Sequence, residues 1–142
     1  MKFNTKYHGE IDYKEEDIIT FKKGMPGFEN LKKFILFDIE ENEVFKILHS
    51  IEDENIGFIV VSPFYVMKDY EFDLDDEKLK SLNVKTPDNV TVYNTVTLNS
   101  KPEDITANLR APIIINNIEH LGEQIILDKD EYKIKYPLFK LN

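Results

Sequence analysis

The stretch that decides the fold is Gly24–Phe64, which reads GMPGFENLKKFILFDIEENEVFKILHSIEDENIGFIVVSPF. Two of its segments, Phe34–Phe37 and Phe58–Val61, are apolar at every position, which is typical of strands covered on both sides. Met25–Phe28 predicts a type II β-turn, because its proline presets φ at the second position and its glycine supplies positive φ at the third. Pro63 has no N–H to donate and should end the second strand. The stretch therefore predicts paired, well-covered strands.

Alternating residues extend this pattern toward the C-terminus. In Val90–Leu98, apolar residues alternate with threonine and tyrosine, which predicts a strand with one buried face. Asn94 falls on the apolar face and should need a hydrogen-bond partner there. Shorter alternations at Ile105–Leu109 and Tyr132–Leu138 predict further strands. Asn116-Asn117 tolerates left-handed conformations and could close a hairpin.

A single helix is expected. Asp75 has the side chain of an N-cap, acidic residues follow it, and the helix should end near Asn83. A short helical turn is also expected at Glu29–Lys32. We therefore predict an all-β protein, a small antiparallel β-barrel or sandwich with one short helix insertion, forming a single domain over residues 1–142.

The composition narrows the functional classes. The 142 residues include no cysteine, which excludes disulfides and thiol catalysis. A net charge of −9 argues against direct binding of nucleic acid and suits a basic protein partner. No apolar run is long enough to cross a membrane, and the first 17 residues lack the apolar core of a secretory signal. We expect a cytoplasmic protein that binds neither nucleic acid nor membrane.

Catalytic motifs are missing from the sequence. The three histidines lie far apart, and neither a phosphate-binding loop nor a nucleophile elbow is present. We therefore expect no catalytic residue, cofactor or metal. The alternative is a small β-barrel hydrolase or carbohydrate-active enzyme that uses acidic residues, which would require Glu52, Asp53, Asp73 and Asp75 to line one pocket. A small-molecule carrier is a third, less supported possibility.

Two segments have features of a binding surface. Pro63–Phe72 is rich in aromatic residues without clean alternation, so it is the best candidate for an exposed patch. Each of its aromatic residues, taken alone, more often belongs to a core. Lys133 and Lys135, with Pro137 after them, suit the protection of an edge strand or a site of strand addition.

Several motifs occur together and in order along the chain. They are ITFKKGMPGFE (Ile19–Glu29), SIEDE (Ser50–Glu54), FIVVSPF (Phe58–Phe64), Tyr70, TANLRAPIIIN (Thr106–Asn116) and GEQIIL (Gly122–Leu127). In these motifs the chain resembles the FliW family of bacterial flagellar assembly factors. The resemblance covers most of the sequence.

The resemblance implies a non-enzymatic regulator with two protein partners. Such a protein binds flagellin and, when free, binds and inhibits the RNA-binding translational regulator CsrA, so that flagellin translation is derepressed. It would be monomeric when free. The motifs supply the candidates for partner binding, which are Glu52, Asp53, Asn55, Tyr70 and Glu71. They also mark Gly24, Pro26 and Gly27 as structural turn residues, and Asn108 as an internal hydrogen-bonding residue rather than a contact.

Overall fold

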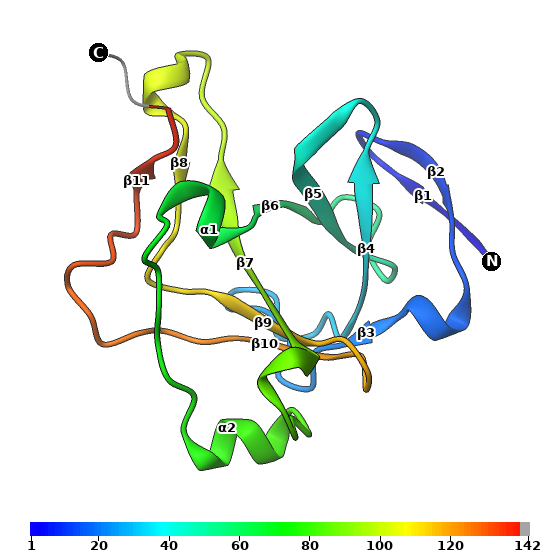
Figure 1. Ribbon diagram of the computed structural model, residues 1–142. Helices are drawn as coiled ribbons and strands as arrows, with labels where there is room; N and C mark the ends of the chain where they lie inside the picture. The colour runs from blue at the N-terminus through cyan, green and yellow to red at the C-terminus, as the bar shows by residue number, and fades with distance from the viewer. Residues whose placement is uncertain (140–142) are drawn as a thin grey trace.

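The computed structural model describes residues 1–139, and within them seven strands close into a ring (Figure 1). In ring order, the strands are β3 (Ile19–Thr20), β4 (Lys33–Ile39), β5 (Asn42–Ser50), β6 (Gly57–Val61), β7 (Val90–Thr97), β9 (Ile113–Asn116) and β10 (Leu121–Gln124). The ring closes because β7 pairs with β9 and β10 pairs with β3. A mostly β, barrel-like fold is thus confirmed.

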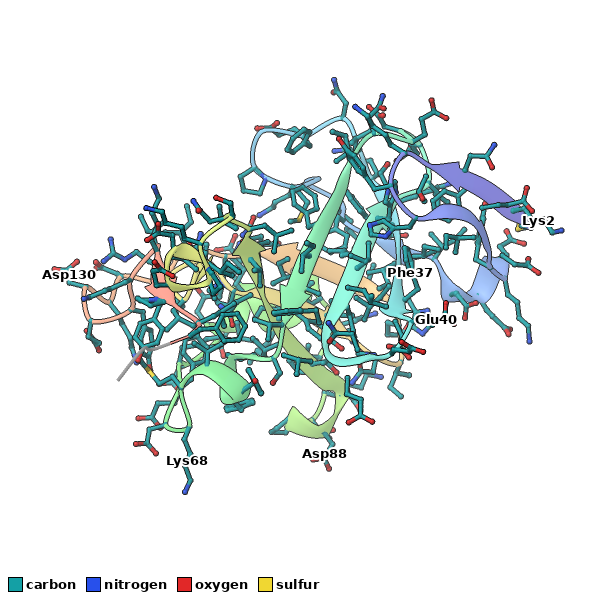
Figure 2. All side chains as sticks on the ribbon, turned by 90° about the horizontal axis from the view of Figure 1, so that it is seen from above. Lys2, Phe37, Glu40, Lys68, Asp88 and Asp130 are labelled. Carbon is teal, nitrogen blue, oxygen red and sulfur yellow. The ribbon has the colours of Figure 1, made fainter. Side chains whose placement is uncertain are left out.

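Two further pieces flank the ring. Strands β8 (Thr106–Ala107) and β11 (Tyr136–Pro137) extend the sheet from one side of β7. Strands β1 (Lys2–Thr5) and β2 (Gly9–Asp12) form a separate hairpin. Viewed from above, Lys2 of the hairpin lies at the opposite end of the molecule from Asp130, which precedes β11 (Figure 2).

Two details of the predicted fold class were wrong. The β3–β10 pair is parallel, so the ring is not purely antiparallel. The described chain also has two short α-helices rather than one, α1 (Pro63–Val66) and α2 (Asp76–Ser81). Three 3-10 turns complete the described elements, at Glu15–Asp17, Pro87–Asn89 and Pro102–Asp104.

The inside of the ring holds the main hydrophobic core. Its buried members are Ile19, Phe21, Met25, Phe34, Leu48, Val60, Ile113 and Ile115. Neighbouring residues on β4, Phe34 and Ile35, are both buried, as are Val60 and Val61 on β6. Strands covered on both sides were expected for these apolar runs. This prediction is confirmed for these two pairs, whereas Leu36, Phe37, Phe58 and Ile59 are only half-buried.

A second hydrophobic cluster lies outside the ring against β7. Its buried members are Tyr70, Leu109, Leu127 and Tyr132, and Val92 packs against them. Tyr93 packs against the main core instead. Strand β7 is confirmed, but the prediction that it buries one face only was wrong, because other segments of the chain cover its outer face.

The glycine turn before β4 has the expected geometry. Gly27 has φ +86°, and Phe28 N–H donates to the Met25 carbonyl at 2.7 Å. Gly24 also has positive φ, and a Cβ there would lie 2.7 Å from the backbone of Glu29. The helical turn predicted at Glu29–Lys32 is not a helix, because the chain forms only a turn closed by Leu31 N–H on the Phe28 carbonyl.

Local capping explains the helix and the last hairpin. The Asp75 carboxylate accepts Lys78 N–H at 2.8 Å, which caps α2 as predicted, and Asn83 follows the helix with φ +57°. The hairpin predicted after Ile113–Ile115 is present as β9–β10. Its left-handed residue is His120, with φ +53°, rather than Asn116 or Asn117.

The prediction of strands from the alternating residues near the C-terminus was largely wrong. Of Tyr132–Leu138, only Tyr136–Pro137 forms a strand, and Ile134 is exposed. Ile105–Leu109 likewise yields only the two residues of β8. β11 is an edge strand, and Lys133 and Lys135 lie before it rather than in it. Within residues 1–139, β11 pairs only with the two-residue strand β8, whereas β8 also pairs with β7, and Ala107 and Leu109 are buried beside it.

Candidate functional site

A groove of about 760 Å³ lies between β5 and β7. The β6–β7 ladder covers only Asn94 and Thr95 of β7, after which Pro63 turns the chain into α1. The early part of β7 is therefore left without β6 beside it. We call this space the seam groove. It is lined by Glu43, Val44, Lys46, Ser62, Phe64, Tyr70–Leu74, Leu79, Val84–Pro87 and Val90–Tyr93.

The walls of the seam groove are mainly apolar. The ring supplies Val44 and Val90, and the segment between β6 and β7 supplies Phe64 and Leu79. The Phe64 side chain remains 59% exposed although it is aromatic. An open apolar surface of this kind is typical of binding sites rather than of an ordinary exterior.

The rim of the groove is predominantly acidic. Glu43, Glu71 and Asp73 lie at the groove together with Lys46 and Lys85. The Lys46 ammonium is already paired with the Asp38 carboxylate. The groove thus presents three acidic side chains against one lysine, Lys85, for which the described residues provide no ion pair.

The groove wall at Tyr70–Phe72 is held by buried hydroxyl groups. Tyr70 is 3% exposed, and its hydroxyl donates to the Leu109 carbonyl at 2.6 Å. Burial raises the pKa of Tyr70 to about 12, so the hydroxyl stays protonated and remains a donor. The Tyr132 hydroxyl donates to the Glu71 carbonyl at 2.8 Å and accepts Glu71 N–H at 2.9 Å.

Two asparagines connect β7 to the chain after β8. Asn94 is fully buried, and its amide N–H donates to the Asn108 carbonyl at 2.7 Å, as its place on an apolar face required. The Asn108 side-chain oxygen accepts the N–H groups of Arg110 and Ala111, each at 3.1 Å. Asn108 is thus an internal hydrogen-bonding residue, as predicted.

Helix α2, at the far end of the groove wall, is fastened to the ring by polar contacts. Lys78 forms an ion pair with Glu123 of β10, and Lys23 lies 3.8 Å from the same carboxylate. The hydrogen bond that Lys78 donates to the Glu123 carboxylate raises the pKa of Lys78. The Asn116 amide donates to the Leu82 carbonyl at 2.7 Å. These contacts attach α2 to β9 and β10 rather than to β5 and β7, the strands that line the groove.

The predicted partner-binding residues fall into two separate places. Glu52, Asp53 and Asn55 lie in the β5–β6 loop, whereas Tyr70 and Glu71 line the seam groove. Glu52 Oε1 accepts the N–H groups of Lys32 and Lys33, at 2.7 and 2.8 Å. Asp53 Oδ1 accepts Asn55 N–H at 2.9 Å. Glu52 and Asp53 thus both accept hydrogen bonds from the backbone of the chain itself. Their contact with a partner stays a prediction.

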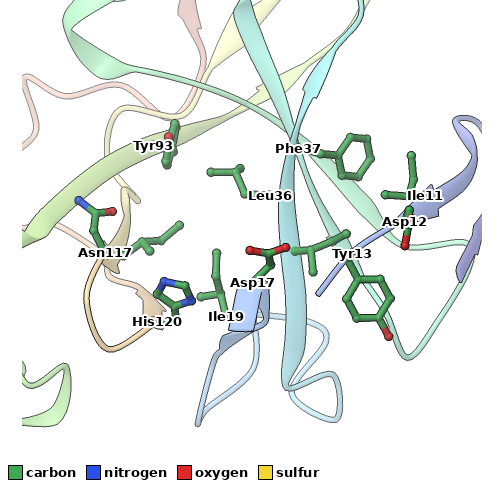
Figure 3. A pocket seen from close by; sticks show the side chains of 12 residues that line it. Ile11, Asp12, Tyr13, Asp17, Ile19, Leu36, Phe37, Tyr93, Asn117 and His120 are labelled. Carbon is green, nitrogen blue, oxygen red and sulfur yellow. The ribbon is translucent and has the colours of Figure 1, made fainter. Parts of the chain in front are cut away.

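A smaller hollow of about 220 Å³ lies at one end of the ring (Figure 3). Asp17 from the first 3-10 turn and His120 from the β9–β10 loop approach it from different elements. Across residues 1–139, no group of three His, Asp or Glu side chains is placed to hold a metal ion.

The four acids named for a hydrolase do not converge. Asp73 lines the seam groove, and Asp53 lies by a separate shallow hollow beside Phe28. Glu52 and Asp75 both cap backbone N–H groups, as described above, and line neither of these spaces. The arrangement expected of a glycosidase is therefore not formed.

Comparison with known proteins settles the family. The FliW protein family model matches residues 2–138. The chain belongs to the FliW family. It is 61% identical over 140 residues to the flagellar assembly factor FliW of Clostridium kluyveri and 60% identical over 140 residues to that of Clostridium tetani. Each alignment covers 99% of this chain and 97% of the relative.

A solved structure agrees with this family. The crystal structure of a flagellar assembly factor FliW superimposes with a TM-score of 0.93 at 41% identity, covering 99% of both chains. FliW proteins are assembly factors rather than enzymes, so the hydrolase alternative is set aside. No helix within residues 1–139 has the length and apolar character needed to cross a membrane.

Sequence reasoning found one wall of the seam groove and missed the other. The aromatic segment Pro63–Phe72 was singled out, and it does contribute Phe64 and Tyr70–Phe72 to the groove. The ring side includes Val44 and Val90–Tyr93, and the alternation at Val90–Leu98 predicts only a strand there. The available signal was Ser62-Pro63, because a proline that ends β6 early must leave the next part of β7 without that neighbour.

Proposed function

We propose that this chain is a non-enzymatic regulator that binds flagellin and, when free of flagellin, binds and inhibits CsrA. Inhibition of CsrA would derepress flagellin translation. The observation that supports this proposal best is the seam groove, an open apolar surface on a protein of the flagellar assembly factor family. It gives the chain a place to hold a protein segment.

The groove has the composition of a protein interface. Apolar side chains such as Val44 and Phe64 line it, and charged side chains such as Glu43 and Asp73 stand at its rim. Protein interfaces share this division between an apolar centre and a polar rim. The arrangement supports binding and offers no group of convergent acids or bases for chemistry.

Charge favours the RNA-binding partner. The net charge of −9 would attract a protein whose surface is basic enough to bind RNA phosphates. Attraction of this kind raises the association rate and weakens with added salt. The acidic β5–β6 loop with Glu52, Asp53 and Asn55, together with Glu71 at the groove, forms the proposed contact set, and Tyr70, which is 3% exposed, holds the wall that carries Glu71.

The proposal includes the form in which the protein acts. We propose one domain over the whole chain, monomeric when free and working in the cytoplasm. Regulation then requires that flagellin and CsrA exclude one another or weaken each other's binding. Direct overlap at the groove is the simplest way to meet this requirement.

A displacement titration tests the proposal. Flagellin added to a preformed complex of this chain with labelled CsrA should release CsrA, and fluorescence anisotropy reports the release. Phe64→Ala should weaken binding of at least one partner, whereas Tyr65→Ala, an exposed neighbour that does not line the groove, should not. Failure of the wild-type chain to bind either protein would refute the proposal.

The acidic loop has its own test. The double variant Glu52→Gln and Asp53→Asn removes two charges and keeps the oxygen acceptors that these side chains supply to the backbone. CsrA association at low salt should slow while the melting temperature stays unchanged, as stopped-flow mixing and thermal scans would show. An unchanged association rate would place the CsrA contact elsewhere.

A further inference from the structure

The seam groove lies along the edge of β7. Side chains on opposite faces of a strand alternate along it. Val92 packs against the outer cluster and Tyr93 against the core, yet both line the groove. Two neighbouring residues can line one groove only where that groove meets the strand edge. The groove therefore contacts the backbone of β7 as well as its side chains.

The hydrogen bonds of β7 show which backbone groups face the groove. Thr95 accepts Asn108 N–H at 2.9 Å, and Asn89 accepts Asn117 N–H at 2.7 Å, so the odd-numbered residues direct their backbone groups toward β8 and β9. Successive residues of a paired strand alternate in this direction. The even-numbered residues, Val92 among them, thus direct their N–H and C=O toward the groove.

Among residues 1–139, no strand pairs with Val92 on that side. β6 reaches only Asn94 and Thr95, and Val90 N–H is taken by the Pro87 carbonyl. The β5–β6 ladder likewise begins at Phe45, so Glu43 and Val44 on the opposite wall have no neighbour from β6. The described chain thus leaves a gap between two strands, which is the condition for addition of a strand from a partner.

The charges around the gap select the occupant. The outer wall contributes Glu71 and Asp73 together with Lys85, and β5 adds Glu43 together with Lys46, whose ammonium is paired with Asp38, so acidic side chains are in excess. A second copy of this chain is a poor occupant because it has the same net charge of −9. A strand between β5 and β7 would point alternate side chains toward Tyr93 inside the ring and the others toward the acidic outer wall. The first set should be apolar and the second basic.

We propose that the seam groove takes an extended segment of a protein partner, which adds as a strand to the open edge of β7 and carries alternating apolar and basic side chains. This inference rests on the proposed function, since it names the mode and the chemistry by which the groove holds a partner. Backbone hydrogen bonds to Val92 supply the pairing, and the acidic wall supplies the selection.

Synthetic peptides test the mode of binding directly. The probe is the capped peptide KVKVTVKVK, with two controls: EVEVTVEVE, and a shuffled peptide of the same composition as the probe that no longer alternates. Full-length labelled chain is titrated with each and followed by NMR. The alternating basic peptide should bind at least about tenfold more tightly than either control. It should slow amide exchange at Val92 and give Hα–Hα contacts from Thr91 and Tyr93.

Two sets of variants locate the binding and define its chemistry. N-methylation of alternate residues on the peptide edge that faces β7 should abolish binding, whereas methylation of the other edge should leave it unchanged. Glu71→Gln with Asp73→Asn should weaken binding of the basic peptide, and Glu15→Gln with Glu16→Gln, outside the groove, should not.

The outcomes separate this inference from the proposed function. Binding without cross-strand contacts, or with no sensitivity to N-methylation, would overturn strand addition. Equal binding of the acidic peptide, or no binding of the basic one at the groove, would overturn the stated chemistry. In either case wild-type binding of flagellin and CsrA would leave the proposed function standing, and loss of both would refute that function whatever the peptides do.

Discussion

The two walls of the seam groove are held in place by different kinds of interaction. The ring wall consists of β5 and β7, whose strands pair with neighbours and enclose a core with fully buried Phe21 and Phe34. The outer wall, residues 63–87, contains α1, α2 and the first residue of the 3-10 turn Pro87–Asn89, and no strand. Figure 1 shows this segment leaving the ring at α1 and returning through α2.

The outer wall depends on the second hydrophobic cluster around Tyr70, which has fewer buried members than the ring core, and on a few hydrogen bonds from side chains to backbone. Tyr70 contacts the Leu109 carbonyl, Tyr132 contacts the backbone of Glu71, and Asn116 contacts the end of α2. Segments with few buried apolar contacts open at lower free energy than a packed core. The comparison indicates a groove with one rigid wall and one wall that adjusts, so it can admit a segment without unfolding the ring.

The largest effect is expected from the ring core. Phe34→Ala should lower the free energy of unfolding by about 3–5 kcal/mol, because it removes a buried aromatic side chain and leaves a cavity. Urea denaturation measures the change, and Phe64→Ala on the exposed outer wall should change stability by less than about 0.5 kcal/mol. Similar losses in the two variants would remove the distinction between the walls.

The glycine turn that enters the ring should respond next most strongly. Gly24→Ala should lower stability by about 2–3 kcal/mol, because positive φ is strained for alanine and its Cβ would meet the Glu29 backbone. Gly27→Val should cost more than about 1 kcal/mol from strain alone, since the space around Gly27 is open. Thermal unfolding ranks the two, and a fully stable Gly27→Val protein would contradict the type II turn.

The outer wall should show a smaller and local effect. Tyr132→Phe removes the hydroxyl that bonds twice to Glu71, so it should cost about 1–2 kcal/mol. Hydrogen exchange should accelerate at residues 67–74 and stay unchanged in β4 and β5. Uniform acceleration across the ring would show that the wall does not open independently of the core.

The smallest expected effect is a change of stability with pH, which arises from His49 in the ring strand β5. Burial lowers the pKa of His49 below its ordinary value of 6.5, although the bond to the Ser50 carbonyl raises it in part, and nearby His8 lowers it further. The unfolded chain therefore binds a proton more readily than the folded one. Stability should be full above about pH 6.5 and decline as the pH falls below it.

A substitution isolates this histidine. His49→Gln should flatten the decline between pH 7 and pH 5, while His120→Gln, at the ring end, should leave it in place. Urea midpoints across this range supply the measurement. An unchanged pH profile in His49→Gln would assign the dependence to other groups.

The sequence predicted those structural elements that depend only on residues close together in the chain. The Asp75 cap, the Met25–Phe28 turn and the doubly buried strands β4 and β6 each follow from neighbouring residues, and the structure contains them. The alternation at Tyr132–Leu138 misled because Tyr132 is buried by its contact with Tyr70, 4.6 Å between ring centroids, and not by a sheet. Periodicity alone does not distinguish these two reasons for burial.

The candidate site was harder to predict because its two walls come from distant parts of the chain. Tyr70 and Glu71 are at the groove, but Val44 and Val92 join them only through the pairing of the ring. The acidic group Glu52–Asp53 looked like a free surface, whereas Glu52 caps the start of β4. A hydrogen bond between a side chain and a backbone group 20 residues away leaves no residue pattern in the sequence from which it could be predicted.

The parallel β3–β10 pair has a consequence for how the molecule is made. Thr20 meets Leu121 across about 100 residues of chain, so the ring closes only after nearly the whole sequence has left the ribosome. Contacts of such long separation form late, because the entropic cost of closing a loop grows with its length. A nascent chain released before β10 would expose unpaired edges of β3 and β9, which invites aggregation. Closure of the ring thus requires β10, and termination before Leu121 should yield insoluble rather than partly active product.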